Sequence, residues 1–115
     1  MTITPMQIEK RLTDLSREIE YSHDELTEAE LNYHTAKAAL EIAMARSRMA
    51  VAHPDHKLTS VQREDMALIE NSEAHMNLAI AEAKVKAARA NANRIRTQVD
   101  IARSVSVSVR SSLDM

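Results

Sequence analysis

The chain contains no glycine among its 115 residues, where average usage would supply roughly eight. Glycine is the residue that lets a backbone turn tightly, end a helix in the left-handed region, or approach a phosphate group closely. Glycine-rich phosphate loops, dinucleotide-binding turns and nucleophile elbows are therefore excluded. Two long heptad patterns stand in their place, and they predict an all-α protein built as a long, coiled-coil-like antiparallel helical hairpin.

The rest of the composition fits long paired helices. Phe and Trp are absent, and charged residues make up 28% of the chain. An apolar set of Ala, Leu, Ile, Val and Met with this charge content is typical of coiled coils. The chain has no cysteine, so disulfide and thiolate chemistry are excluded. No apolar signal segment or membrane-spanning stretch is evident, and we expect a cytoplasmic protein with no membrane partner.

The first predicted helix spans residues 5–52. Thr4 and Gln7 form a capping box around Pro5, which suits the first helical position. Pro54 ends the helix, because the residue before a proline is displaced from the helical region. Between these limits the apolar spacing alternates four and three, as in a heptad seam. The seam consists of Ile8, Leu12, Leu15, Ile19, Ser22, Leu26, Ala29, Tyr33, Ala36, Leu40, Ala43, Ser47 and Ala50.

A turn at residues 53–59 leads to the second predicted helix, residues 60–110. Thr59 and Gln62 offer a second capping box at its start. Because the connection is short, the two helices must run antiparallel, and residues 1–115 form a single helical hairpin. The seam of the second helix consists of Ala67, Asn71, Ala74, Leu78, Ala81, Val85, Ala88, Ala92, Ile95, Val99, Ala102, Ser106, Val109 and Leu113.

Each predicted helix carries a second apolar line near the turn. A helix with two apolar lines needs neighbours on two sides. We therefore expect two or more copies to form a four-helix bundle near the turn, as a dimer or tetramer, with thinner arms at the far end. A lone hairpin with solvated alanine faces is the alternative. The predicted oligomer interface consists of Leu31, Ala38, Ile42, Ala45, Met49, Met66, Ile69, Met76, Ile80, Ala83 and Ala87.

Charge is unevenly distributed along the chain. Residues 1–41 hold nine acids and four bases, whereas residues 82–115 hold three acids and seven bases. If the chain folds back at residue 56, the acidic stretch Glu18 to Glu30 lies beside a basic stretch. Ion pairs between the two stretches are each weak, but they select the antiparallel orientation. The basic stretch contains Lys84, Lys86, Arg89, Arg94 and Arg96. Candidate nucleic-acid contacts are Lys84, Lys86, Arg89, Arg94, Arg96, Arg103 and Arg110. Their spacing scatters charge around the helix and no aromatic residues accompany them, which favours a salt-bridged or solvated face over a DNA site.

The histidines are weak candidates for metal binding. His53 and His56 flank Pro54 and Asp55 in the turn, but no third close ligand is evident, and we predict no metal or other cofactor. His34 and His75 fall at similar levels of the hairpin and offer a possible pH-sensitive pair, although surface histidines are favoured.

No nucleophile, base and orienting acid assemble at a defined spacing. The sequence therefore predicts no catalytic residues and no enzyme. The tail, residues 104–112, alternates Ser and Val as a strand does, but it also continues the heptad. A helix end is favoured, and a strand that adds to a partner's sheet edge stays open.

Several short runs resemble the small helical hairpin proteins encoded in early or accessory regions of tailed-phage genomes. The resemblance implies a protein that interacts with the host or assists phage DNA metabolism. Helical hairpins secreted by ESX systems have a similar length and shape, but His53-Pro-Asp-His56 replaces their Trp-x-Gly turn, so membership of that family is rejected. The runs are Glu25-Leu26-x-x-Ala29-x-x-x-Tyr33, Ala36-Lys37-Ala38, Ile42-Ala43-x-Ala45-Arg46, Ala79-x-Ala81-Glu82-Ala83 and Asp100-x-x-Arg103-Ser104-x₅-Arg110.

These features favour a non-enzymatic, self-associating helical protein that acts by binding another protein, either a host factor or a phage protein. The candidate contact surfaces are the turn, with His53, Asp55, His56 and Lys57, and the far-end arms, with Arg103 and Arg110. The first alternative is an accessory protein of phage DNA recombination or replication that binds single-stranded DNA through its basic second helix. The second alternative is a structural spacer.

Overall fold

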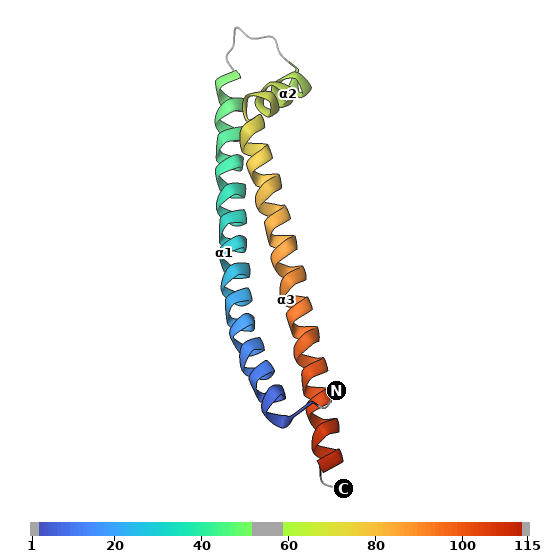
Figure 1. Ribbon diagram of the computed structural model, residues 1–115. Helices are drawn as coiled ribbons and strands as arrows, with labels where there is room; N and C mark the ends of the chain where they lie inside the picture. The colour runs from blue at the N-terminus through green and yellow to red at the C-terminus, as the bar shows by residue number, and fades with distance from the viewer. Residues whose placement is uncertain (1–2, 52–58, 114–115) are drawn as a thin grey trace. The chain divides into compact units, whose positions relative to one another are not determined.

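The computed structural model describes residues 3–51 and 59–113, and these residues form three α-helices (Figure 1). Helix α1 spans Pro5–Val51, α2 spans Ser60–Glu70 and α3 spans Ser72–Leu113. The predicted all-α class is confirmed. The turn residues proposed as ligands or contacts (His53, Asp55, His56 and Lys57) lie outside the described residues.

Both predicted capping boxes are present. The backbone N–H of Gln7 donates to the Thr4 hydroxyl at 3.3 Å, and the Thr4 N–H donates to the Gln7 side-chain oxygen at 3.0 Å. Thr59 and Gln62 make the same reciprocal pair at 3.1 and 3.0 Å. Each box satisfies two backbone N–H groups that a helix start leaves unpaired. At the other end of the chain, residues 104–112 belong to α3, so the favoured helical reading of the tail is confirmed.

The second predicted helix differs from the structure, because Asn71 divides it into α2 and α3. Asn71 has φ −106° and ψ 23°, outside the helical range. Its side-chain amide donates to the Ala67 carbonyl at 2.8 Å and to the Ser47 hydroxyl of α1 at 2.9 Å. An asparagine side chain that bonds the backbone in this way competes with the helical pattern. In a chain without glycine, Asn71 thus ends a helix.

The chain divides into two compact units. Unit 1 is Met1–Glu28 with Lys86–Met115, and unit 2 is Ala29–Val85. In unit 1, the N-terminal part of α1 packs antiparallel to the C-terminal part of α3. Its core consists of Leu15, Ile95 and Val99, with Ala102 packed against them. Leu15 is only 1% exposed. A chain that folds back at residue 56 places position 15 opposite position 97, and the two partners of Leu15, Ile95 and Val99, lie on either side of that position.

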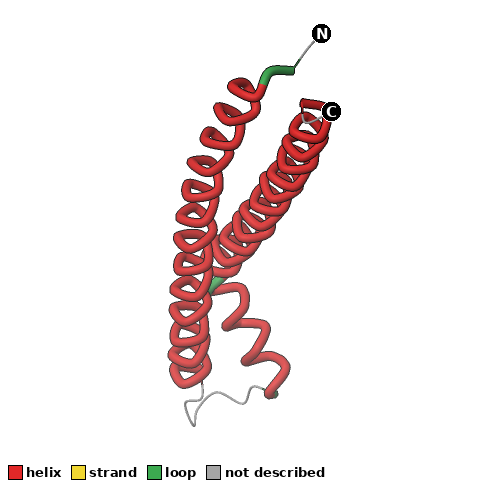
Figure 2. The backbone as a smooth tube through the Cα atoms, turned by 90° about the horizontal axis from the view of Figure 1, so that it is seen from below, coloured by secondary structure: helices red, strands yellow, loops and turns green. Residues whose placement is uncertain are grey.

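Unit 2 contains the rest of α1, all of α2 and the start of α3. Its core consists of Leu40, Met44 and Ala67, with Ala74 and Leu78 packed against them. Figure 2 shows α2 turned away from the direction of α3 within this unit. Because of that turn, α2 brings Ala67 against α1 and leaves it fully buried, with 0% exposure.

The two predicted seams line the interiors of both units. Among their members only Ile19, Ala50 and Leu113 are exposed, and all the others are buried or half-buried. The heptad pattern therefore identified the packed side of each helix correctly. Met44 is the main addition, because it lies in the core of unit 2 although it is not a seam residue.

Candidate interaction surfaces

Unit 2 exposes a set of large apolar side chains. Every member of the predicted oligomer interface is exposed in the chain, and Ala87 is the only one that belongs to unit 1. The large members come from all three helices, and their exposure ranges from 47% to 79%. We call this set the apolar surface of unit 2: Leu31, Ile42, Met49, Met66, Ile69, Met76 and Ile80.

A bidentate ion pair ties α2 to α1 beside this surface. The Arg48 guanidinium contacts the Glu64 carboxylate through Nε at 2.7 Å and through its Nη2 at 3.1 Å. Both side chains are about half exposed, so the pair contributes little to stability. Arg48 is next to Met49 in the sequence and Glu64 is two residues from Met66, so the ion pair joins the two helices close to members of this surface.

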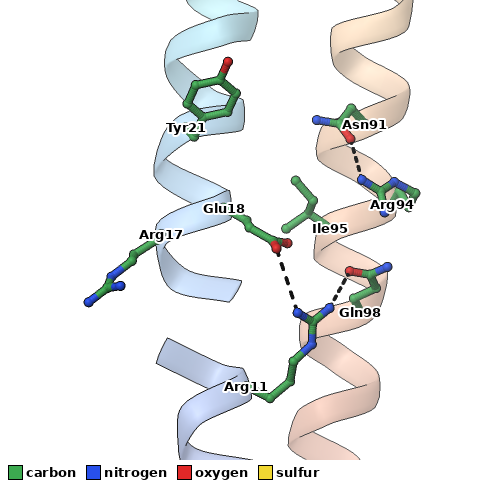
Figure 3. A pocket seen from close by; sticks show the side chains of 8 residues that line it. All are labelled: Arg11, Arg17, Glu18, Tyr21, Asn91, Arg94, Ile95 and Gln98. Atoms are coloured by element: carbon green, nitrogen blue, oxygen red, sulfur yellow. Dashed lines mark hydrogen bonds and ion pairs between the residues drawn. The ribbon is translucent and has the colours of Figure 1, made fainter. Parts of the chain in front are cut away.

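A pocket of about 440 Å³, lined mostly by polar and charged residues, lies on one side of unit 1 (Figure 3). The Arg11 guanidinium lies between the Glu18 carboxylate of α1, at 3.8 Å, and the Gln98 amide oxygen of α3, at 3.1 Å. Arg94 donates to Asn91 at 2.8 Å, and Arg17, which also lines the pocket, extends away from α3 in Figure 3. Arg11 and Arg94 are thus already engaged by neighbouring side chains. Through its contact with Gln98, Arg11 links α1 to α3 beside the pocket.

Among the described residues, the expected pairing of the acidic and basic stretches is wrong for three of its five basic members, Lys84, Arg94 and Arg96. In the described part of unit 1, neither Arg94 nor Arg96 forms an ion pair with the acids of α1. Arg94 bonds Asn91 on its own helix, and Arg96 lies in a groove with His23. Lys86 and Arg89 each have an interaction partner in the chain.

A row of arginines runs along α3 in unit 1. Arg89, Arg96, Arg103 and Arg110 follow one another at intervals of seven residues, and each comes directly after a seam residue. Positions seven apart lie on one line along a heptad-packed helix, so the four share one edge of the α1–α3 contact. We call them the arginine row. The candidate nucleic-acid set as a whole is scattered, but this regular repeat within it was missed, although the spacing was visible in the sequence.

Three members of the arginine row are available for binding. Arg96, Arg103 and Arg110 are exposed, and within residues 3–51 and 59–113 they make no hydrogen bond or ion pair. Beside Arg96 and Arg103 lies a groove of about 430 Å³, which we call the unit 1 groove. Its lining residues are Ile19, Ser22, His23, Leu26, Ala92, Arg96, Val99, Asp100 and Arg103.

The other basic candidate, Lys84, belongs to unit 2. It lines a small pocket of about 220 Å³ with Ala29, Asn32 and Asn77. Lys84 is therefore grouped with uncharged side chains and not with the arginine row, which lies entirely within unit 1.

Among the described residues, no hydrogen bond joins His34 and His75. His34 is exposed and its ring lies edge-on to Tyr33, with centroids 5.2 Å apart. His75 is half-buried, and its Nε2 is buried with no hydrogen-bond partner among the described residues.

We expect His75→Leu to raise the free energy of unfolding by about 1 kcal/mol, because a buried polar atom without a partner is costly and leucine removes it. Chemical denaturation of the full chain measures the change. His34→Leu is the matched control, since His34 is exposed and is expected to leave stability unchanged. A loss of stability in His75→Leu would show that the imidazole makes a favourable polar contact.

Among the described residues no group of three or more His, Asp or Glu side chains is placed to hold a metal ion. None of the three helices has a stretch long and apolar enough to cross a membrane within the described residues. Comparison of the chain with protein-family models, with curated proteins and with solved structures finds no match.

Proposed function

We propose that this chain is a non-enzymatic helical protein that acts by binding other proteins, and that copies of it assemble through the apolar surface of unit 2. The observation that carries the proposal is the exposure of that surface. Met49, Met76 and Ile69 are 79%, 66% and 73% exposed, and they come from three different helices. Large apolar side chains that stay exposed in this number are typical of protein interaction sites.

The accessible area of the chain is large enough for a partner to cover part of it. The chain exposes 9034 Å², whereas a compact monomer of 12.9 kDa exposes roughly 6,300 Å². The difference, roughly 2,700 Å², is well above the roughly 800 Å² that each partner contributes to an interface of standard size. Self-association at unit 2 would cover part of this excess with side chains that are already apolar.

The geometry of unit 2 also favours a preformed interface. The Arg48–Glu64 ion pair and the buried Ala67 hold α2 against α1. Helix α2 is therefore held in place before a partner arrives, which reduces the entropic cost of association. We propose a four-helix contact in which α1 and the α2–α3 segment of one copy pack on those of another.

Light scattering coupled to size exclusion tests the proposal. We expect the unaltered chain to elute as a dimer or tetramer, and the double variant Ile42→Glu with Ile80→Glu to elute as a monomer, because it places two charges in the apolar contact. Ile101→Glu is the matched control, since Ile101 is 58% exposed, close to the 54% of Ile42, but lies in unit 1. A monomeric unaltered chain, or an oligomeric double variant, would contradict the proposal.

The partner beyond self is proposed to be a host factor or a phage protein, as the resemblance of the sequence to phage helical hairpins implies. The alternative of single-stranded DNA binding has less support. Lys86 and Arg89 have partners in the chain and Arg94 bonds Asn91, so three of the seven candidate cations are engaged. A purely structural spacer would need no exposed row of arginines.

A further inference from the structure

We propose that the arginine row and the unit 1 groove bind an amphipathic helix of a partner protein that carries an acidic residue every seven residues. The inference rests on the proposed function only in its premise that this chain binds protein. It does not require self-association, because the row and the groove belong to unit 1 and the apolar surface belongs to unit 2.

The spacing of the row points to a helix. Successive arginines lie seven residues apart, which is roughly 10.5 Å along the axis of α3. A second helix packed beside α3 presents one heptad position at the same interval. Carboxylates at that position lie level with Arg96, Arg103 and Arg110 in turn. Ion pairs beside a coiled-coil seam determine which helix binds and in which orientation. A periodic row of arginines can form such ion pairs with an acidic helix.

The groove supplies the apolar part of the contact. Ile19 is a seam residue, but it remains 41% exposed, unlike most of the residues that follow the same pattern. It lines the groove together with Leu26 and Val99, beside Arg96 and Arg103. An approaching helix can place its apolar residues on Ile19 and its acidic residues on the arginines. The result is a local three-helix packing.

The charge of the surroundings favours a protein helix over a nucleic acid. Unit 1 holds nine basic and nine acidic residues, so it has no net charge with which to attract a polyanion. Asp100 lies in the groove and would repel a continuous phosphate backbone. A helix can instead present a neutral or basic residue opposite Asp100. Tyr21, the only tyrosine of unit 1, lines the pocket of Figure 3 and not the groove, so the imidazole of His23 is the one aromatic ring that the described residues place beside the row.

The partner helix is not one from a second copy of this chain. No position in the sequence repeats an acid three times at seven-residue intervals. The nearest approach is Glu18 and Glu25, which Asn32 follows, and Glu18 is paired with Arg11. The acidic helix therefore belongs to a different protein.

Fluorescence anisotropy with two synthetic helical peptides tests the inference on the full chain. Both peptides have leucine at the two seam positions of each heptad and the same number of glutamates. The in-register peptide has one glutamate per heptad beside the seam, and the shifted peptide has it on the opposite face. We expect the in-register peptide to bind about tenfold more tightly, because only it aligns its acids with the row. An oligothymidylate is the third probe.

Variants of matched charge identify the surface. Replacing Arg96, Arg103 and Arg110 with glutamine is expected to raise the Kd of the in-register peptide about tenfold, since three exposed ion pairs are lost. The control replaces Lys10, Arg17 and Arg94 with glutamine, because these are exposed basic residues of unit 1 outside the row. We expect it to change the Kd of the in-register peptide by less than about twofold. Equal weakening by both triple variants would overturn the inference, because it would indicate a general charge effect.

Two other results would overturn the inference that the arginine row binds an acidic helix. One is equal affinity for the in-register and shifted peptides. The other is row-dependent binding of the oligothymidylate without binding of the in-register peptide, which would assign the row to a nucleic acid. The Ile42→Glu, Ile80→Glu variant separates the two proposals: we expect it to be monomeric and still to bind the in-register peptide. If it stays oligomeric while the peptide binds, the proposed function fails and this inference stands.

Discussion

Leu15→Ala is expected to lower the free energy of unfolding by about 2–5 kcal/mol, a large share of the stability of a small domain. Leu15 is 1% exposed and packs between Ile95 and Val99, so its side chain fills the centre of the unit 1 core. The neighbouring helices offer few other large side chains with which to close the gap. A cavity would therefore remain, and its cost adds to the lost burial of the leucine itself.

Denaturant titration at a fixed protein concentration measures the effect, because self-association would make stability depend on concentration. Leu113→Ala is the control, since this leucine also belongs to unit 1 but is 67% exposed. We expect it to change stability by less than about 0.5 kcal/mol. Similar losses in both variants would contradict the description of Leu15 as the centre of the core.

The sequence was sufficient to predict those features of the fold that depend on near neighbours. The capping boxes at Thr4 and Thr59 join residues three apart, and both are present. The seams follow from a regular period, and Leu15 lies in the interior that its seam position predicts. Such features need no knowledge of how distant segments meet, because each one is a local rule of helix geometry.

The break at Asn71 was not predicted, since the heptad pattern continues through it. Asn71 occupies a seam position, and only the contact with Ser47 on α1 shows what its side chain does there. The burial of Met44 depends on the same break, because α2 covers Met44 once it turns away from α3. Both features follow from a tertiary contact that a pattern along one helix does not contain.

For the candidate sites, the sequence predicted one surface and did not single out the other. The exposure of the apolar side chains of unit 2 follows from the same period as the seam, whereas their role as an oligomer interface stays a prediction. The arginine row was present in the sequence but was hidden within a larger basic set. The structure separates it by showing that Arg94 is bonded to Asn91 while Arg96 and Arg103 line a groove.

Ala67→Leu is expected to displace α2 and to lower the free energy of unfolding by about 1–3 kcal/mol. Ala67 is fully buried, with 0% exposure, against Leu40 and Met44. A leucine at this position needs space that the contact with α1 does not contain. The faster hydrogen exchange of the α2 amides, measured by mass spectrometry, would report the displacement. Leu68→Ala, at a neighbouring position that is 48% exposed, is the control and is expected to leave α2 protected.

Combining Ala67→Leu with Leu40→Ala decides whether the fit between these two side chains determines the docking of α2. Leu40→Ala alone is expected to cost about 2–5 kcal/mol, because it empties the space that a 7% exposed leucine fills. In the double variant the larger residue at position 67 occupies part of that space. We therefore expect the double variant to lose at least about 1 kcal/mol less than the two single losses added together. Strict additivity would mean that Ala67 and Leu40 do not share a packing site, and that the polar contact from Asn71 to Ser47 holds α2 in its place instead.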